Sequence, residues 1–175
     1  MNRYHLGKLL VLILVLAMAG KTVADDAPFA GTPLAPLAAF IGNWEINTTW
    51  ADGTSLWSRN EFTVGLGGRF LEARTFAKDG DGDVYERYRT VYGVDPDTGE
   101  LISYGFTNDG SVTIVDNMTV EEDGPALTSE WSGNGTTIRQ TVRFTSADEY
   151  NWKVWMRGDD DWTEIMNANW QRVPD

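Results

Sequence analysis

Turn-forming residues recur every ten to fifteen positions along this chain, and this spacing restricts the fold more than any single motif does. The segments between the turns alternate apolar and polar residues or are rich in β-branched and aromatic residues, as in strands with one buried face. The connectors are short and rich in Gly, Asp and Asn, which suits hairpins between antiparallel neighbours. Ten strands are predicted, at about residues 43–50, 56–65, 69–77, 83–94, 100–107, 111–120, 126–132, 136–145, 149–157 and 162–172.

A train of ten hairpin-linked strands favours a closed barrel. A flat sheet of that width curls, and closure removes both exposed edges. A sandwich with Greek-key links would need longer crossovers than these connectors supply. The sequence therefore predicts an all-β, antiparallel up-and-down β-barrel of about ten strands over residues 40–173. Residues 25–39 are expected to form a leader and a short N-terminal helix, and "PLAPLAAF" (33–40) is interpreted as a short helix or turn that leads into the first strand.

The first 24 residues have the layout of a secretory signal peptide. A basic start precedes an apolar run of 10 residues at 9–18, which is too short to span a bilayer. Small-residue cleavage patterns then end at Ala19 and Ala24, and cleavage after Ala24 is favoured. We therefore expect an exported protein, in the periplasm or outside the cell, with no stable membrane association after cleavage. A retained membrane anchor is the alternative.

Charge narrows the range of partners. The chain carries a net charge of −12, and cleavage after Ala24 would remove Arg3, Lys8 and Lys21 but no acid, which gives −15. A chain of this charge repels phosphate groups, so nucleic acid and anionic membranes are disfavoured as partners.

Two missing residue types narrow the chemistry. The sequence has no Cys, and its one His is His5, inside the predicted signal peptide. The predicted mature chain therefore lacks Ser-His-Asp and Cys-His pairs, the usual zinc ligand sets and a histidine for haem. No metal and no cofactor are predicted, and only Asp, Glu, Lys, Tyr and Arg remain for acid–base chemistry.

The string "FIGNW" carries a Gly-x-Trp pair, at Gly42 and Trp44. In this pair, and in the spacing of "GGRFLEARTF" and "GVDPDTGELISYGF", residues 40–173 resemble the lipocalin-like (calycin) superfamily, in particular bacterial members of unknown function. The resemblance implies that Trp44 packs at the closed end of the barrel beneath a basic residue from the last strand. Arg172 stands at the corresponding place, and we assign Trp170 to the same end. Nitrobindin-like relatives hold haem through a His that the mature chain lacks, so that activity is not expected.

Aromatic residues give the strongest functional indication. A barrel of ten strands is wider than its own side chains easily fill, so a cavity is expected. The alternation of the strands directs six tryptophans inward: Trp44, Trp50, Trp131, Trp152, Trp162 and Trp170. Apolar walls with a few polar groups are typical of ligand pockets. The predicted ligand-binding residues are Trp50, Phe62, Tyr88, Gln140, Trp152, Glu164 and Met166.

Four polar side chains are expected on the buried face, at Asn60, Asp116, Gln140 and Glu164. A buried carboxylate is costly unless it is paired or protonated, so Glu164 is the first candidate for contact with a ligand. The alternative is that an arginine of another strand neutralises it, with Arg74, Arg87 and Arg89 as candidates. For residues 69–77 and 83–94 the sequence does not decide which face is buried.

Three functions remain open. The leading hypothesis is an exported β-barrel that binds a small, mostly apolar or aromatic molecule in an aromatic-lined cavity. The second, less favoured, is an enzyme that uses carboxylate and tyrosine acid–base chemistry on such a ligand, with Glu164 as the catalytic base. The third is a barrel filled by its own side chains that acts as an interaction module. The sequence does not indicate an oligomeric state.

Overall fold

The fold was analysed in a computed structural model of the chain. The structure describes residues 27–121, 126–133, 135–158 and 161–174. The predicted signal peptide, residues 1–24, lies outside the described residues. No helix within the described ranges is both long and apolar enough to cross a membrane.

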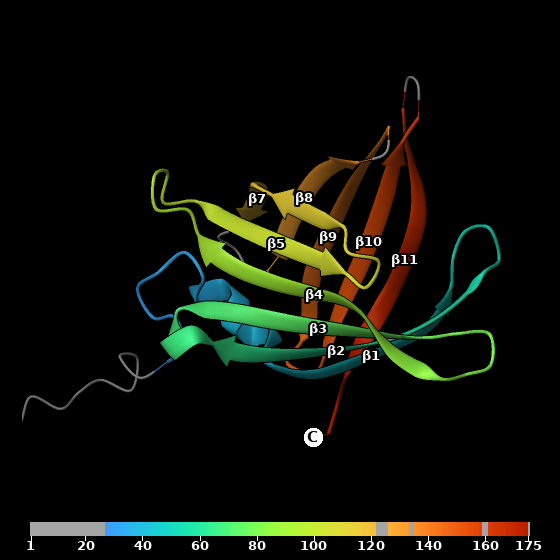
Figure 1. Ribbon diagram of the computed structural model, residues 1–175, viewed down its shortest axis with the longest axis horizontal. Helices are drawn as coiled ribbons and strands as arrows, with labels where there is room; N and C mark the ends of the chain where they lie inside the picture. Colours follow the sequence, from blue (N-terminus) through green and yellow to red (C-terminus); the bar gives the residue numbers. More distant parts are fainter. Residues whose placement is uncertain (1–26, 122–125, 134, 159–160, 175) are drawn as a thin grey trace, which may run out of the picture.

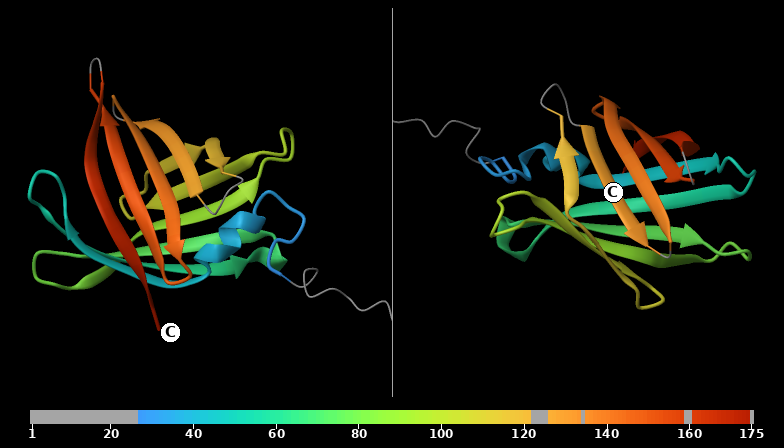
Figure 2. Two further views of the ribbon diagram at one scale, coloured as in Figure 1. Left: turned by 180° about the vertical axis from the view of Figure 1, so that it is seen from behind. Right: turned by 90° about the horizontal axis from the view of Figure 1, so that it is seen from above.

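The described residues form one antiparallel sheet of eleven strands in the order β6-β5-β4-β3-β2-β1-β11-β10-β9-β8-β7. The sheet curls into a nearly closed barrel (Figures 1 and 2), so the predicted all-β, up-and-down architecture is confirmed. The strands are β1 (Gly42–Thr49), β2 (Ser55–Gly65), β3 (Phe70–Lys78), β4 (Val84–Val94), β5 (Leu101–Thr107), β6 (Val112–Val115), β7 (Asn117–Val120), β8 (Ala126–Gly133), β9 (Thr136–Ser146), β10 (Glu149–Arg157) and β11 (Trp162–Val173).

The difference between ten predicted strands and eleven observed ones lies at Asp116. The segment predicted as one strand, 111–120, is divided there into β6 and β7. β6 pairs with β5, whereas β7 pairs with β8, so this divided segment joins the two edges of the sheet. Asp116 itself is exposed, and the prediction that it points inward is wrong. The interruption of the ladder places it outside the alternation of either strand.

One end of the barrel is covered by the segment that precedes β1. This segment forms a 3-10 turn, η2 (Ala35–Phe40), and the short N-terminal helix that the sequence predicts is not confirmed. Leu37 and Phe40 are buried, and both face the barrel interior. A second 3-10 turn, η3 (Leu66–Gly68), lies between β2 and β3 at the same end. We call this the closed end.

On β3 the structure shows which of the two faces that the sequence left open is buried. Leu71 and Ala73 are buried inside the barrel. Arg74 lies on the outer wall, where its guanidinium binds the carboxylates of Glu61 on β2 and Glu86 on β4, at 3.2 and 2.8 Å. The charged residues of this part of the wall therefore neutralise one another outside the barrel, and not within it.

A β-bulge on β11 changes the orientation of every residue before it. Val154 pairs with Met166, and the next residue, Trp155, pairs with Glu164, which leaves Ile165 as the extra residue. The alternation is shifted at this point, as bulges require. Glu164 is therefore exposed, and the prediction that it points inward is wrong.

The same bulge explains a second error. Trp162 was expected inside, but its ring lies against the guanidinium of Arg139 at 4.2 Å. Arg139 in turn binds the carboxylate of Glu130 at 2.9 Å, on the outer wall. The alternation before the bulge is thus opposite to that after it, where Trp170 is buried.

Candidate ligand-binding cavity

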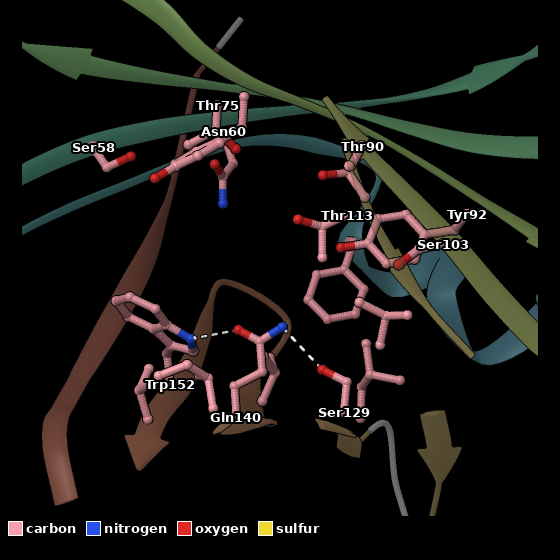
Figure 3. Close-up of a pocket in the computed structure, with 18 of the residues that line it drawn as sticks. Ser58, Asn60, Thr75, Thr90, Tyr92, Ser103, Thr113, Ser129, Gln140 and Trp152 are labelled. Carbon is pink, nitrogen blue, oxygen red and sulfur yellow. Dashed lines mark hydrogen bonds between the residues drawn. The ribbon is translucent and has the colours of Figure 1, made fainter. Parts of the chain in front are cut away.

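The barrel encloses a cavity of about 580 Å³ (Figure 3). This volume lies within the range of small-molecule sites, about 300 to 1,000 Å³. Every strand except β1 contributes to its lining, as does η2, so the fold as a whole positions the site. The cavity has three zones: an aromatic floor at the closed end, a middle zone of neutral polar groups, and an open end.

Trp44 lies beneath the aromatic floor, outside the cavity lining, and supports it. Its side chain is fully buried, and its indole Nε1 donates a hydrogen bond to the carbonyl oxygen of Phe40 at 2.6 Å. The guanidinium of Arg172 lies over the indole face at 4.2 Å. Trp44 and Arg172 are directly paired on β1 and β11, so the sheet register brings the cation to the ring.

Arg172 also ties four segments together. Its Nη1 and Nη2 donate to the carbonyl oxygens of Ile41 and Ala39, at 2.7 and 3.1 Å. Its Nε donates to the carbonyl oxygen of Ala147, at 3.1 Å, and lies 3.3 Å from the carboxylate of Asp148. One side chain thereby joins the end of η2, the start of β1, the turn between β9 and β10, and β11.

Gly42 is required by this arrangement. Its φ of 121° lies in the region that residues with a side chain rarely adopt. A Cβ at this position would lie 2.6 Å from Nη1 of Arg172. The absence of a side chain at Gly42 therefore lets the guanidinium reach the backbone carbonyls of the closed end.

Aromatic rings cover the inner side of the floor. The ring of Phe40 lies 5.2 Å from that of Phe62 and 5.4 Å from that of Tyr150, measured between centroids. Trp170 stacks on Tyr150 at 5.8 Å with an angle of 19° between the ring planes. These four residues line the cavity. They form a largely apolar surface of ring faces and edges against which a bound ring can pack.

Two tyrosines carry hydroxyl groups into this region. Burial raises the pKa of Tyr150 well above its ordinary value, and a hydrogen bond with the Asn60 side chain offsets only part of this effect. Burial also raises the pKa of Tyr92 to about 12. Both phenols are therefore neutral at physiological pH, and they serve as hydrogen-bonding groups and not as bases.

A chain of hydrogen bonds crosses one wall of the middle zone. The indole Nε1 of Trp152 donates to Oε1 of Gln140 at 3.1 Å, and Nε2 of Gln140 donates to Oγ of Ser129, also at 3.1 Å. Figure 3 shows this chain along β10, β9 and β8. Gln140 and Ser129 are paired directly across β8 and β9, so the ladder register holds the contact.

Asn60 lies on the opposite wall, on β2, with its amide directed into the space between the walls (Figure 3). Its Oδ1 is buried and has no hydrogen-bond partner within the described residues. A buried carbonyl oxygen without a partner costs about 1–3 kcal/mol. The atom of Asn60 that points into the space between the walls is the amide nitrogen, and not Oδ1 (Figure 3).

The open end is lined by rings and by one cation. Trp50 and Trp152 meet edge to face, with centroids 5.8 Å apart. Arg87 is exposed, and its guanidinium lies 5.0 Å from the centre of the Tyr88 ring. A bulge between Thr75 and Phe76 turns Arg87 toward this end.

The cavity holds almost no charge. Apart from Arg87, the lining residues that the structure describes are neutral, and Asp, Glu and Lys are absent from them. Nowhere in the described ranges do three or more His, Cys, Asp or Glu side chains gather in a way that could hold a metal ion. The chemistry that this interior offers is hydrogen bonding and apolar contact.

The structure brings most of the predicted ligand-binding residues into one cavity. Trp50, Phe62, Tyr88, Gln140 and Trp152 line it. Met166 is buried but lies behind the lining, and Glu164 is outside. Sequence reasoning did not select Ser129, although it shares the inward face of β8 with Leu127 and Trp131. The alternation of β8 contained the necessary signal, but serines carry little weight in a search for apolar faces.

No protein-family model matches the chain, and no curated protein matches its sequence. Among solved structures, the chain is similar to EF1p2_mFAP2b bound to DFHBI, with 12% sequence identity and a TM-score of 0.42. That similarity covers 79% of this chain and 97% of the other. A likeness of this degree does not bear on function, and the barrel fold rests on the strand pairing described above.

Proposed function

We propose that this protein is an exported, lipocalin-like β-barrel that binds a small, mostly apolar or aromatic molecule in its cavity. The observation that carries the proposal is the cavity of about 580 Å³ with an aromatic floor and an almost uncharged lining. Removing an apolar ring from water into such a space is favourable by about 25 cal/mol per Å² of apolar surface. The neutral polar groups of the middle zone would orient the molecule.

Export and family membership belong to the same proposal. The apolar run at 9–18 with the cleavage pattern ending at Ala24 supports passage into the periplasm or the extracellular space. The contact between Arg172 and Trp44 at one end of the barrel supports the lipocalin-like resemblance. Expression of the full chain in a bacterial host tests export. The expected product is periplasmic or secreted and begins at Asp25 in its intact mass, whereas an unprocessed cytoplasmic product would contradict the proposal.

The two other functions find less support. The enzyme hypothesis relied on Glu164 as a buried base, but this carboxylate is exposed on the outer wall. The filled barrel required Trp152, Trp162 and Met166 to meet across the axis. Trp162 instead lies outside against Arg139, and the interior is hollow.

Ligand binding can be tested with N-phenyl-1-naphthylamine, an uncharged dye that fluoresces strongly in apolar surroundings. We expect saturable binding to the protein. A variant that narrows the cavity, Thr90→Phe, should weaken dye binding, because Thr90 lines the cavity. Thr119→Phe is the matched control, since Thr119 is exposed on β7. Far-UV circular dichroism verifies that both variants fold. Equal dye binding by the two variants would show that the dye binds elsewhere.

Glu164→Gln separates the binding and enzyme hypotheses at the level of one residue. Because Glu164 is exposed, its neutralisation should leave the affinity for the dye unchanged within about two-fold, which corresponds to about 0.4 kcal/mol. A loss of ten-fold or more would return this carboxylate to the binding site.

A further inference from the structure

The polar middle zone restricts which apolar molecules the cavity accepts. The hydrogen-bond chain from Trp152 through Gln140 to Ser129 has one possible direction. An indole N–H is only a donor, so the Gln140 atom that faces it must be the carbonyl oxygen. The amide nitrogen of Gln140 is then the atom that faces Ser129, and it donates to Oγ.

This direction determines the role of Ser129. Its oxygen is occupied as an acceptor by Gln140, and its own proton remains to be donated. Within the described part of the chain, no residue accepts a hydrogen bond from this hydroxyl. Ser129 is only 2% exposed and lines the cavity. A buried hydroxyl that has lost water and finds no acceptor is costly, so this wall presents a donor.

The opposite wall presents no matching acceptor. Oδ1 of Asn60 can only accept, but it has almost no accessible surface, and Figure 3 shows the amide nitrogen of Asn60 directed into the space between the walls. The other polar groups of the lining include the hydroxyls of Thr90, Ser103 and Thr113, which donate as well as accept. The cavity therefore offers donors to a bound molecule, and Ser129 is the donor whose direction the surrounding hydrogen bonds fix.

We propose that the cavity selects neutral, ring-containing molecules that carry a carbonyl or ether oxygen toward Ser129. This inference rests on the proposed function, because it specifies the class of molecule bound at the same site. Gln140 acts as a positioning residue, since it fixes which atom of Ser129 is available. The lining lacks a cation at this depth, so a carboxylate would lose hydration there without a partner.

Matched naphthalenes test the selection by displacement of N-phenyl-1-naphthylamine at pH 6.5. 2-Acetylnaphthalene and 2-isopropenylnaphthalene have almost the same shape, but only the first carries an oxygen acceptor. We expect the acetyl compound to bind about five-fold more tightly than the isopropenyl compound, as one net hydrogen bond predicts.

Variants assign the preference to Ser129. Ser129→Ala should remove the preference for the acetyl group, whereas the control Ser132→Ala, on the same strand but exposed, should retain it. Gln140→Leu should also reduce the acetyl preference, because the hydroxyl of Ser129 would then be free to rotate.

The outcomes distinguish the two proposals. If the dye and the isopropenyl compound bind but the acetyl compound has no advantage, the selection at Ser129 is wrong while the binding function stands. If the acetyl preference persists in Ser129→Ala, the donor lies elsewhere and the inference is overturned. If neither the dye nor any naphthalene binds, the proposed function itself fails.

Discussion

At the scale of single residues, Gly42 and Arg172 depend on each other. The guanidinium occupies the space in which a Cβ of residue 42 would lie, and it uses that position to bind the carbonyls of Ile41 and Ala39. A family resemblance suggested that these two positions and Trp44 belong to one end of the barrel. It did not suggest the reason for the glycine, which is visible only when the arginine is placed.

Gly42→Ala should therefore lower the free energy of unfolding by more than backbone strain alone would. A methyl group at Gly42 faces both a φ of 121° and a contact of 2.6 Å with Nη1 of Arg172. We expect a loss of about 3 kcal/mol in the free energy of unfolding, measured in urea. Gly53→Ala is the matched control. Gly53 has a φ of 88°, but a Cβ added there would have no atom within 4 Å. It should lose about 1 kcal/mol. Equal losses would mean that Arg172 moves aside freely.

Tyr92 gives the protein a stability limit in alkaline solution. Its pKa is about 12 in the folded barrel, against an ordinary value of 10.0. Below pH 10 the phenol is protonated in both states, and its full contribution to stability is present. Above pH 10 the unfolded chain loses the proton while the folded chain keeps it. Stability should therefore fall by about 3 kcal/mol as the pH rises from 10 through 12.

Comparison of variants isolates this effect from the titration of lysines. Tyr92→Phe should show a shallower decline of the urea midpoint over this pH interval than the unmodified protein. Tyr85→Phe removes an exposed tyrosine on the same strand and should leave the decline unchanged. If the two variants behave alike, burial of Tyr92 is not the cause.

At the scale of elements, the segments that meet at the closed end are held together by the side chain of Arg172, and not by hydrogen bonds between strands. Arg172 links η2, β1, β11 and the turn between β9 and β10 through three backbone carbonyls. Lysine cannot replace this fork, because its ammonium is a single point of charge. Arg172→Lys should lose about 2 kcal/mol and accelerate amide exchange at 35–41.

Arg74→Lys is the contrasting substitution on the outer wall. Arg74 binds Glu61 and Glu86, but its side chain is 46% exposed. Exposed ion pairs contribute about 0–1 kcal/mol, so the cost should be below 1 kcal/mol. A larger loss for Arg74→Lys than for Arg172→Lys, in the same urea titration, would contradict the view that the closed end is the stronger junction.

The strands also show where sequence reasoning reaches its limit. Alternation correctly predicted the inward faces of β9 and β10, because both keep a regular register over most of their length. It failed at Glu164, Trp162 and Asp116, each of which lies beyond an interruption of the ladder. A bulge adds one residue without a distinctive residue type, so the pattern of apolar positions does not reveal it. The errors are therefore local, and the regular segments gave the correct fold class.

At the scale of the whole molecule, the cavity was predictable in kind but not in chemistry. The number of strands and the inward tryptophans indicated a hollow barrel lined by rings. The donor at Ser129 could not be predicted, because its direction depends on the hydrogen bonds of Gln140 and Trp152 on the two following strands. These hydrogen bonds join β8, β9 and β10 through side chains that the alternation of any one strand does not connect.

The divided strand around Asp116 gives the barrel a seam. β6 pairs only with β5, and β7 pairs only with β8. Among the described residues, the other edge of each of these two strands has no strand partner. The strands on either side of Asp116 can therefore separate without breaking any of the ladder hydrogen bonds described above. Local opening of the barrel should therefore be most frequent between β6 and β7. Such opening would give a ligand a route through the side of the barrel, in addition to the route through the open end.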